Sequence, residues 1–447
     1  MKRGIVVMTG LLALAVAGQN VQAKTLEEVL KEKGVITEAD YNDILKSAPK
    51  TKPFDYKLGK GFTFTSPDEK FQLSVGGNMQ LLYTYTQKDG VGTENSSDWR
   101  IRRVKTSFGG YAFSKDLTYK VLLNWSELGG STNSTKVLEE AYLNYKIIDE
   151  AQILVGEDKV QYGRQEITSS GAQQFVDRSF VVNAFKPSYD IGVNVHGDIM
   201  KGLFKYDAEW VGGKGQNTTS TNNNNAYNLR LAVNPLGDMK YSEADIEMSA
   251  KPLLGIGGSY YHNTLRLTST ADTSAPPKIS NAFESNNDSY AGSSGWLGKN
   301  SKVFQLAPAA GKSAYQNVNI NTFETDMAFK WMGLSAQAEY FWAEGVGQTN
   351  NATVISNGFY AQLGYMVLPK QLELAVRYAW MDYNWATPND NQTEVQGAIS
   401  WYIQGHNLKI QADVTKQHIQ QNSVVAGLNT NNPLDNTIFR VQTQLNF

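Results

Sequence analysis

The chain of 447 residues has no cysteine, four histidines and, beyond its first two dozen residues, no long apolar run. The missing cysteine excludes disulfides, thiolate metal sites and a lipidated amino-terminal cysteine. Without a later stretch of about 20 apolar residues, the rest of the chain offers no candidate for a membrane-spanning helix. The formal charge of −2 argues against nucleic acid as a partner.

The amino terminus, MKRGIVVMTGLLALAVAGQNVQA, predicts a secretory signal peptide over residues 1–23. Lys2 and Arg3 form a basic start, an apolar stretch follows, and Val21 and Ala23 suit a cleavage site. Cleavage would remove two basic residues and no acid, which moves the formal charge from −2 to −4. We therefore expect an exported protein that is either soluble or a β-barrel, because only helices and closed barrels span lipid.

Residues 25–47 carry convincing helical signals. The pairs Thr25–Glu28 and Thr37–Asp40 have the spacing of capping boxes, and Gly34 separates two short apolar-faced stretches. The pattern predicts two short helices that rest on another part of the protein or oligomerise on the periplasmic side. A lysine-rich stretch follows, so that residues 24–60 are expected to form a helical segment and a linker.

From Phe71 onwards the apolar pattern has a period of two, which is typical of β-strands with one apolar and one polar face. The final segment, TIFRVQTQLNF, alternates cleanly and ends on Phe447. A terminal aromatic on such a strand resembles the signal read by the outer-membrane barrel assembly machinery. The expected strands begin near residues 71, 99, 117, 137, 152, 190, 203, 226, 251, 320, 334, 354, 371, 391, 407 and 437.

Short turns alternate with long polar loops along this region, and tyrosine and tryptophan gather toward the strand ends. Both features are typical of outer-membrane barrels, whose aromatic girdles lie at the two membrane interfaces. We therefore predict an all-β protein, a transmembrane antiparallel β-barrel of about 16 strands over residues 61–447 with a short periplasmic helical segment before it. The expected location is the Gram-negative cell outer membrane, in contact with its lipid.

Charged residues at inward positions and in the third long loop are the candidates for controlling solute passage. Their signs nearly balance, except in WRIRRVK, where Arg100, Arg102, Arg103 and Lys105 form a basic stripe that could hydrogen-bond phosphate or pair with carboxylates. The pore-lining or anion-binding candidates are Arg102, Arg103, Lys105, Lys159, Arg164, Arg178, Lys186, Arg230, Arg377, Lys409 and Arg440.

Three segments resemble the phosphate-selective porin O and P family of Gram-negative outer membranes. They are residues 99–125, beginning WRIRRVKTSFGG, residues 139–197, which include VGEDKVQYGRQE, and residues 357–382, NGFYAQLGYMVLPKQLELAVRYAWMD. The resemblance implies a sixteen-stranded barrel, a homotrimer, an inward-folded third loop and a basic path for ions or phosphate. By position, Arg102 and Arg103 look like the family's paired arginines, and Lys159 like the lysine that opens the constriction loop.

The sequence departs from the family pattern at two places. Glu157 and Asp158 stand where the family often has Gln-Phe before the lysine, and Tyr189 with Asp190 precede Ile191 where an arginine is often found. Acids beside Lys159 would weaken its field. The sequence therefore favours a porin for passive diffusion of small hydrophilic solutes and ions, with a stronger anion or phosphate preference left open.

Other functions remain as alternatives. A surface adhesin or receptor could use the long loop near residues 263–319, and a soluble secreted β protein would share the alternation. An outer-membrane enzyme is disfavoured, because none of the four histidines has a nucleophile partner in sequence and no metal-ligand spacing stands out. We expect no enzyme activity, no metal and no cofactor.

Overall fold

A computed structural model describes residues 30–47, 53–89, 94–128, 137–218, 224–268, 278–279, 315–348, 351, 353–420 and 433–447. The chain divides into two compact units between Lys52 and Pro53. The predicted signal peptide and the Thr25–Glu28 pair lie outside the described residues, as does most of the 263–319 loop.

The amino-terminal unit contains helix α2 (Glu38–Ser47). The predicted capping box is confirmed: the Thr37 amide donates to Asp40 Oδ2 at 3.0 Å, and the Asp40 amide donates to Thr37 Oγ1 at 3.1 Å. Gly34, with φ of 66°, ends the preceding helical turn, and the Val35 amide reaches back to the Leu30 carbonyl at 2.9 Å. Among the described residues, no helix is long and apolar enough to cross a membrane.

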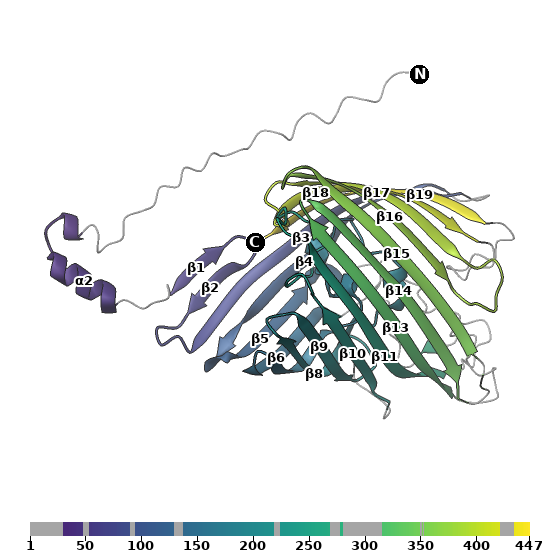
Figure 1. Ribbon diagram of the computed structural model, residues 1–447, viewed down its shortest axis with the longest axis horizontal. Helices are drawn as coiled ribbons and strands as arrows, with labels where there is room; N and C mark the ends of the chain where they lie inside the picture. The colour runs from purple at the N-terminus through teal and green to yellow at the C-terminus, as the bar shows by residue number, and fades with distance from the viewer. Residues whose placement is uncertain are drawn as a thin grey trace, which may run out of the picture. The chain divides into compact units, whose positions relative to one another are not determined.

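The second unit is a closed antiparallel barrel of 16 strands, each paired with the next in sequence, and β19 pairs with β3 to complete the ring (Figure 1). The predicted strands are confirmed. The predicted and observed first residues of a strand differ most for β13. The strands are β3 (Phe71–Gln87), β4 (Ser96–Ala112), β5 (Ser114–Asn124), β6 (Leu138–Ile148), β7 (Ala151–Lys159), β8 (Tyr189–Ile199), β9 (Phe204–Val211), β10 (Ala226–Val233), β11 (Leu253–Thr268), β13 (Tyr315–Trp331), β14 (Leu334–Gly347), β15 (Thr353–Leu368), β16 (Leu372–Asp382), β17 (Gln392–Tyr402), β18 (Leu408–Ile419) and β19 (Leu434–Asn446).

The period of two places apolar side chains outside and polar side chains inside. On β19, Phe439 is 42% exposed on the outer face, whereas Arg440 beside it is buried inside the barrel. Such alternation suits strands that have lipid on one side and a lumen on the other. In outer-membrane barrels, the end with the short turns faces the periplasm.

The sequence predicts a linker up to residue 60, and this prediction is wrong for its last part. Strand β1 (Phe54–Lys57) pairs with β2 (Gly61–Thr65), and β2 continues the sheet beside β3. β2 occupies the edge of β3 at residues 72–75, next to the part of that edge where β19 ends. The four-residue β1 was missed because FDYK, between lysine-rich turns, is too short to show a period.

Of the connections that the structure describes in full, two fold into the lumen. One is loop 3, residues 160–188, between β7 and β8. The other, residues 234–252 between β10 and β11, lies at the end of the short turns yet contains several buried residues. Strand β12 (Lys278–Ile279) pairs with the last two residues of β11.

Closure of the barrel can be tested by a disulfide, because the chain has no cysteine of its own. Tyr83 and Val441 are directly opposite each other on β3 and β19. Opposite residues have Cα atoms roughly 4.5–5.5 Å apart, within the range of a disulfide. We expect the Y83C/V441C variant to form a cross-link on mild oxidation, seen as a mobility shift on a non-reducing gel. The pair Y83C/V395C, with the second cysteine on β17, is the control and should not cross-link; the reverse result would contradict the ring.

Candidate functional site

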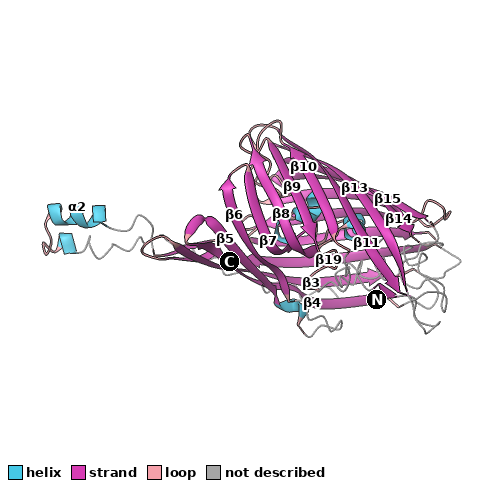
Figure 2. Ribbon diagram, turned by 90° about the horizontal axis from the view of Figure 1, so that it is seen from below, coloured by secondary structure: helices cyan, strands magenta, loops and turns pink. Residues whose placement is uncertain are grey.

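Loop 3 folds into the lumen and contains three short helical turns. They are α3 (Arg164–Ile167), η2 (Ser170–Ala172) and α4 (Phe180–Phe185), which appear in cyan inside the strands (Figure 2). Ser179 begins α4 and its side chain accepts a hydrogen bond from the Val181 amide. This is the inward-folded third loop that the family resemblance implies.

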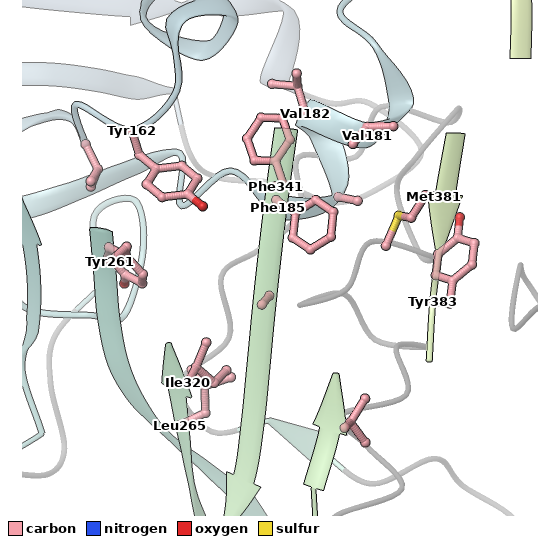
Figure 3. Close-up of a cluster of buried hydrophobic side chains, with 14 of the residues drawn as sticks. Tyr162, Val181, Val182, Phe185, Tyr261, Leu265, Ile320, Phe341, Met381 and Tyr383 are labelled. Atoms are coloured by element: carbon pink, nitrogen blue, oxygen red, sulfur yellow. The ribbon is translucent and has the colours of Figure 1, made fainter. Parts of the chain in front are cut away.

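The apolar side of α4 packs against inward side chains of β14–β16 and belongs to a buried cluster that also includes side chains of β11 and β13 and Tyr383 just beyond β16 (Figure 3). Phe185 stacks on Phe341 with ring centroids 5.4 Å apart and planes within 2°. Sequence reasoning missed this cluster because it treated inward positions as polar. The signal was present: FVVNAF is apolar inside a polar loop, and Phe341 falls at an inward position. Burial of these rings fixes α4 to one wall of the barrel.

Asp177 attaches the middle of loop 3 to three strands. Its carboxylate accepts hydrogen bonds from Arg102 of β4 and from Arg440 of β19, the latter at 3.1 Å. Its backbone carbonyl accepts from Arg377 of β16 at 2.9 Å. Arg440 also binds Asp413 of β18 through two nitrogens, at 2.7 and 3.0 Å. These paired charges tie the loop to strands on both sides of the β19–β3 seam.

Other contacts extend the attachment along the same wall. Lys409 Nζ donates to the Gln173 carbonyl at 2.8 Å. Arg164 lies 3.7 Å from Asp326, which in turn accepts from Arg230 at 2.5 Å. The candidate side chains Arg230, Arg377, Lys409 and Arg440 are at most 2% exposed. The structure therefore places them beneath loop 3, in contact with carboxylates, amides or carbonyls.

The opposite side of the lumen holds an open cavity of about 650 Å³, bounded by β3–β7 and by loop 3. Eight basic and four acidic side chains line it, so that basic side chains exceed acidic ones by four. The basic ones are Lys60, Arg102, Arg103, Lys105, Lys120, Lys159, Arg178 and Lys186, and the acidic ones are Glu127, Glu139, Glu140 and Glu166. Six of the eleven predicted candidates are thus brought together around one space.

Two β-bulges explain how neighbouring residues can share the lumen face. In β4 the pairing with β3 skips Arg102, so that Arg102 and Arg103 both turn inward. In β6 the pairing with β5 skips Glu139, and both Glu139 and Glu140 line the cavity. Strict alternation would send one member of each pair to the lipid. The bulges thus bring Arg102 into the basic stripe and Glu139 to the same lumen face on β6. There Glu139 forms an ion pair with Lys105.

Glu166 organises the part of loop 3 that faces the cavity. Arg178 Nε and Lys186 Nζ lie 3.0 and 3.5 Å from Glu166 Oε2, and Lys159 Nζ donates to the Glu166 carbonyl at 2.9 Å. Burial alone would raise the pKa of Glu166, but the charges of Arg178 and Lys186 outweigh it and lower the pKa to about 2. Glu166 therefore stays ionised at neutral pH and offsets part of the positive field of its neighbours.

The two acids before Lys159 have different positions. Asp158 pairs across the strands with Asp190 on the inner face. Glu157 lies at an outward position, where its carboxylate accepts from the Asn217 amide at 2.6 Å beneath the segment that follows β9. Only Asp158 therefore shares the inner face, and the effect of either acid on the field of Lys159 stays a prediction.

The histidines contact amides, a carboxylate and an aromatic ring. His196 lies 3.0 Å from Asn144 Oδ1, His262 2.9 Å from Asn321 Oδ1 and His418 3.0 Å from Asp435 Oδ1. His406 meets the Tyr402 ring edge-on. Within the described ranges, no group of three or more His, Asp or Glu side chains is placed to hold a metal ion.

Comparison with known proteins agrees with the barrel and its inward loop. A sequence profile described as phosphate-selective porin O and P matches residues 73–447. The chain belongs to this family. An uncharacterized protein of Aquifex aeolicus (strain VF5) is 24% identical over 266 residues, which is 53% of this chain. The chain spans 60% of the length of that relative.

Several solved outer-membrane proteins share the fold. The anion-selective porin of Comamonas acidovorans matches with a TM-score of 0.53 at 8% identity, over 83% of this chain and 99% of its own. The channel DcaP of Acinetobacter baumannii matches with a TM-score of 0.51 at 11% identity, over 87% of this chain and 100% of its own. The trimer form of OmpT of Vibrio cholerae matches with a TM-score of 0.52 at 9% identity, over 84% of this chain and 99% of its own. Identities this low show the fold alone, which is that of an outer-membrane porin.

Gly364 of β15 offers a direct test of how closely loop 3 packs. A Cβ at this glycine would lie 2.1 Å from Gln174 Nε2 and 2.6 Å from Glu373 Oε1. We expect G364V to push Gln174 and loop 3 toward the cavity, and so to lower the single-channel conductance in planar bilayers. The control is G397V, since the nearest atom to a Cβ there is 4.0 Å away. Equal conductance of the two variants would contradict the tight seating of the loop.

Proposed function

We propose that the protein is a passive outer-membrane channel that lets small hydrophilic anions, phosphate among them, cross along its basic wall. Catalysis has no part in this proposal. The observation that carries it is the separation of charge inside the barrel. Eight basic groups against four acidic ones border the cavity, whereas the carboxylates of the opposite wall lie beneath loop 3.

The covered carboxylates are almost completely removed from water. Glu324, Glu339, Glu373 and Asp413 are each at most 2% exposed and bind loop 3 or neighbouring strands. A solute in the cavity meets these acids only at a distance, whereas the stripe of β4 borders it directly. The near balance of charge in the sequence therefore becomes an excess of positive charge where a solute would pass.

The basic wall offers two kinds of anion contact. Arg103 supplies a guanidinium group that fits the oxygens of phosphate or carboxylate, whereas Lys105, Lys120 and Lys159 act as point charges. Arg102 belongs to the same wall, but its guanidinium is bound to Asp177. Glu139 and Glu140 keep the lysines partly neutralised, so that an anion exchanges one partner for another as it moves. Weak, repeated binding of this kind favours conduction over capture.

We also propose that the protein is a homotrimer inserted in outer-membrane lipid. The outward apolar face of the strands supports contact with lipid, and the likeness in fold to the trimer form of OmpT supports the trimer. Phe447 remains the proposed recognition point for the barrel assembly machinery. A function as a surface adhesin has no support in the described residues, since the loop near 263–319 lies largely outside them.

Anion preference can be measured as the zero-current potential of the purified protein in a planar bilayer under a KCl gradient. We expect an anion-favouring potential, and a fall in chloride current when millimolar phosphate is added. R103Q should reduce the anion-to-cation permeability ratio about threefold, corresponding to roughly 0.7 kcal/mol for one charge in a largely aqueous passage.

The matched control is K416Q, which removes an exposed lysine from the outer face of β18. It should leave the permeability ratio unchanged. A cation-favouring potential of the wild-type protein would contradict the anion path, and absence of conductance steps would contradict the channel itself.

A further inference from the structure

The connection between β10 and β11, residues 234–252, folds into the lumen from the periplasmic end; we call it the strap. Turns at this end of a barrel are ordinarily a few residues long and exposed. In the strap, Met239, Glu243, Ala244 and Asp245 are instead at most 3% exposed. Because the carboxylates of Glu243 and Asp245 are buried, they need hydrogen-bond partners within the protein.

The base of the strap is fixed to the barrel wall. Asp245 Oδ2 accepts from the Gly333 amide at 2.8 Å, and the same carboxylate caps the Ser249 amide at 3.0 Å. Ser242 Oγ accepts from Lys330 Nζ at 2.7 Å. Ala244 packs with Met366 and Tyr402, and Ile246 and Met248 pack against the same cluster. The strap therefore behaves as part of the wall.

Glu243 joins this fixed base to loop 3. Its Oε1 accepts from Gln165 Nε2 at 2.6 Å, and its Oε2 accepts from the Gln174 amide at 2.7 Å. Its own amide donates to the Ala172 carbonyl at 3.1 Å. Glu243 thus hydrogen-bonds loop 3 at two places, in α3 and just after η2. Both lie on the face of the loop that is turned away from the cavity.

We infer that Glu243 positions the part of loop 3 around Gln165 and Gln174, and that the strap thereby sets the width of the passage. Gln165 is the neighbour of Glu166, which lines the cavity and binds Arg178 and Lys186. Gln165 and Gln174 also bind the wall, through Glu339 and Glu373. Loss of the Glu243 contacts would therefore loosen this part of the loop and let it fluctuate toward the open space. The inference rests on the channel of the proposed function, and it is independent of the anion preference.

Single-channel recording tests the inference. E243Q keeps the size of the side chain but leaves a single acceptor oxygen, so that one of the two accepted hydrogen bonds is lost and the other loses its charge. Loss of one charged hydrogen bond changes an equilibrium about tenfold. We expect closures or current fluctuations to become about tenfold more frequent. E247Q, an exposed acid of the same strap, is the control and should match the wild type. If the closures and current fluctuations of E243Q are as frequent as those of the wild type, the inference is overturned.

A covalent variant separates positioning from loss of folding. Because the chain has no cysteine, A172C/E243C places a single disulfide pair where the backbones already hydrogen-bond. The oxidised form should conduct quietly and the reduced form should fluctuate as E243Q does. Identical behaviour of the two forms, in protein that keeps its heat-modifiable gel mobility, would overturn the inference.

Hydrogen exchange provides a readout that needs no conductance. In detergent, E243Q should speed amide exchange in residues 163–176 about tenfold relative to E247Q, because the anchored state becomes less populated. Unchanged exchange would overturn the strap's role, even in a protein that conducts. Faster exchange in a protein without anion preference would instead contradict the proposed function and leave the strap's role standing.

Discussion

The structure depends on the docking of loop 3 against the wall formed by β11–β19. An ionised group buried in the lumen is costly unless it is paired, and the loop supplies partners for groups that the strands alone leave exposed. Asp177 joins Arg102 and Arg440, Gln174 binds Glu373, and α4 covers the ring of Phe341. Apolar burial holds one end of the loop and paired charges hold its middle.

This docking decides what a solute meets inside the barrel. The inward side chains carry both signs in nearly equal number, and a barrel open on all sides would have a mixed lining. Loop 3 covers the acid-rich wall and leaves the cavity beside β3–β7, where basic groups are in excess. The ion preference of the channel therefore depends on which wall loop 3 covers. The net charge of the whole chain determines it only indirectly.

The sequence predicted what depends on local periodicity. The strand starts, the inward position of Arg440 and the capping box at Thr37 are confirmed, because each follows from a repeat or a fixed spacing. It could not predict the bulges at Arg102 and Glu139, since one extra residue changes the face without altering the composition. Nor could it show that residues 234–252 turn inward, because their partners are far away in sequence. The roles of the individual basic candidates remain predictions.

The most direct measurement of the central claim is the zero-current potential of a variant whose loop 3 is shortened, with residues 164–186 replaced by a few glycines and serines. Removal of the loop would expose Glu324, Glu339, Glu373 and Asp413 to the lumen and also remove the basic groups of the loop itself. The account predicts that the potential moves toward cation preference while conductance rises, in protein that keeps its heat-modifiable gel mobility. An unchanged or more anion-favouring potential would show that the covered carboxylates do not matter and would contradict it.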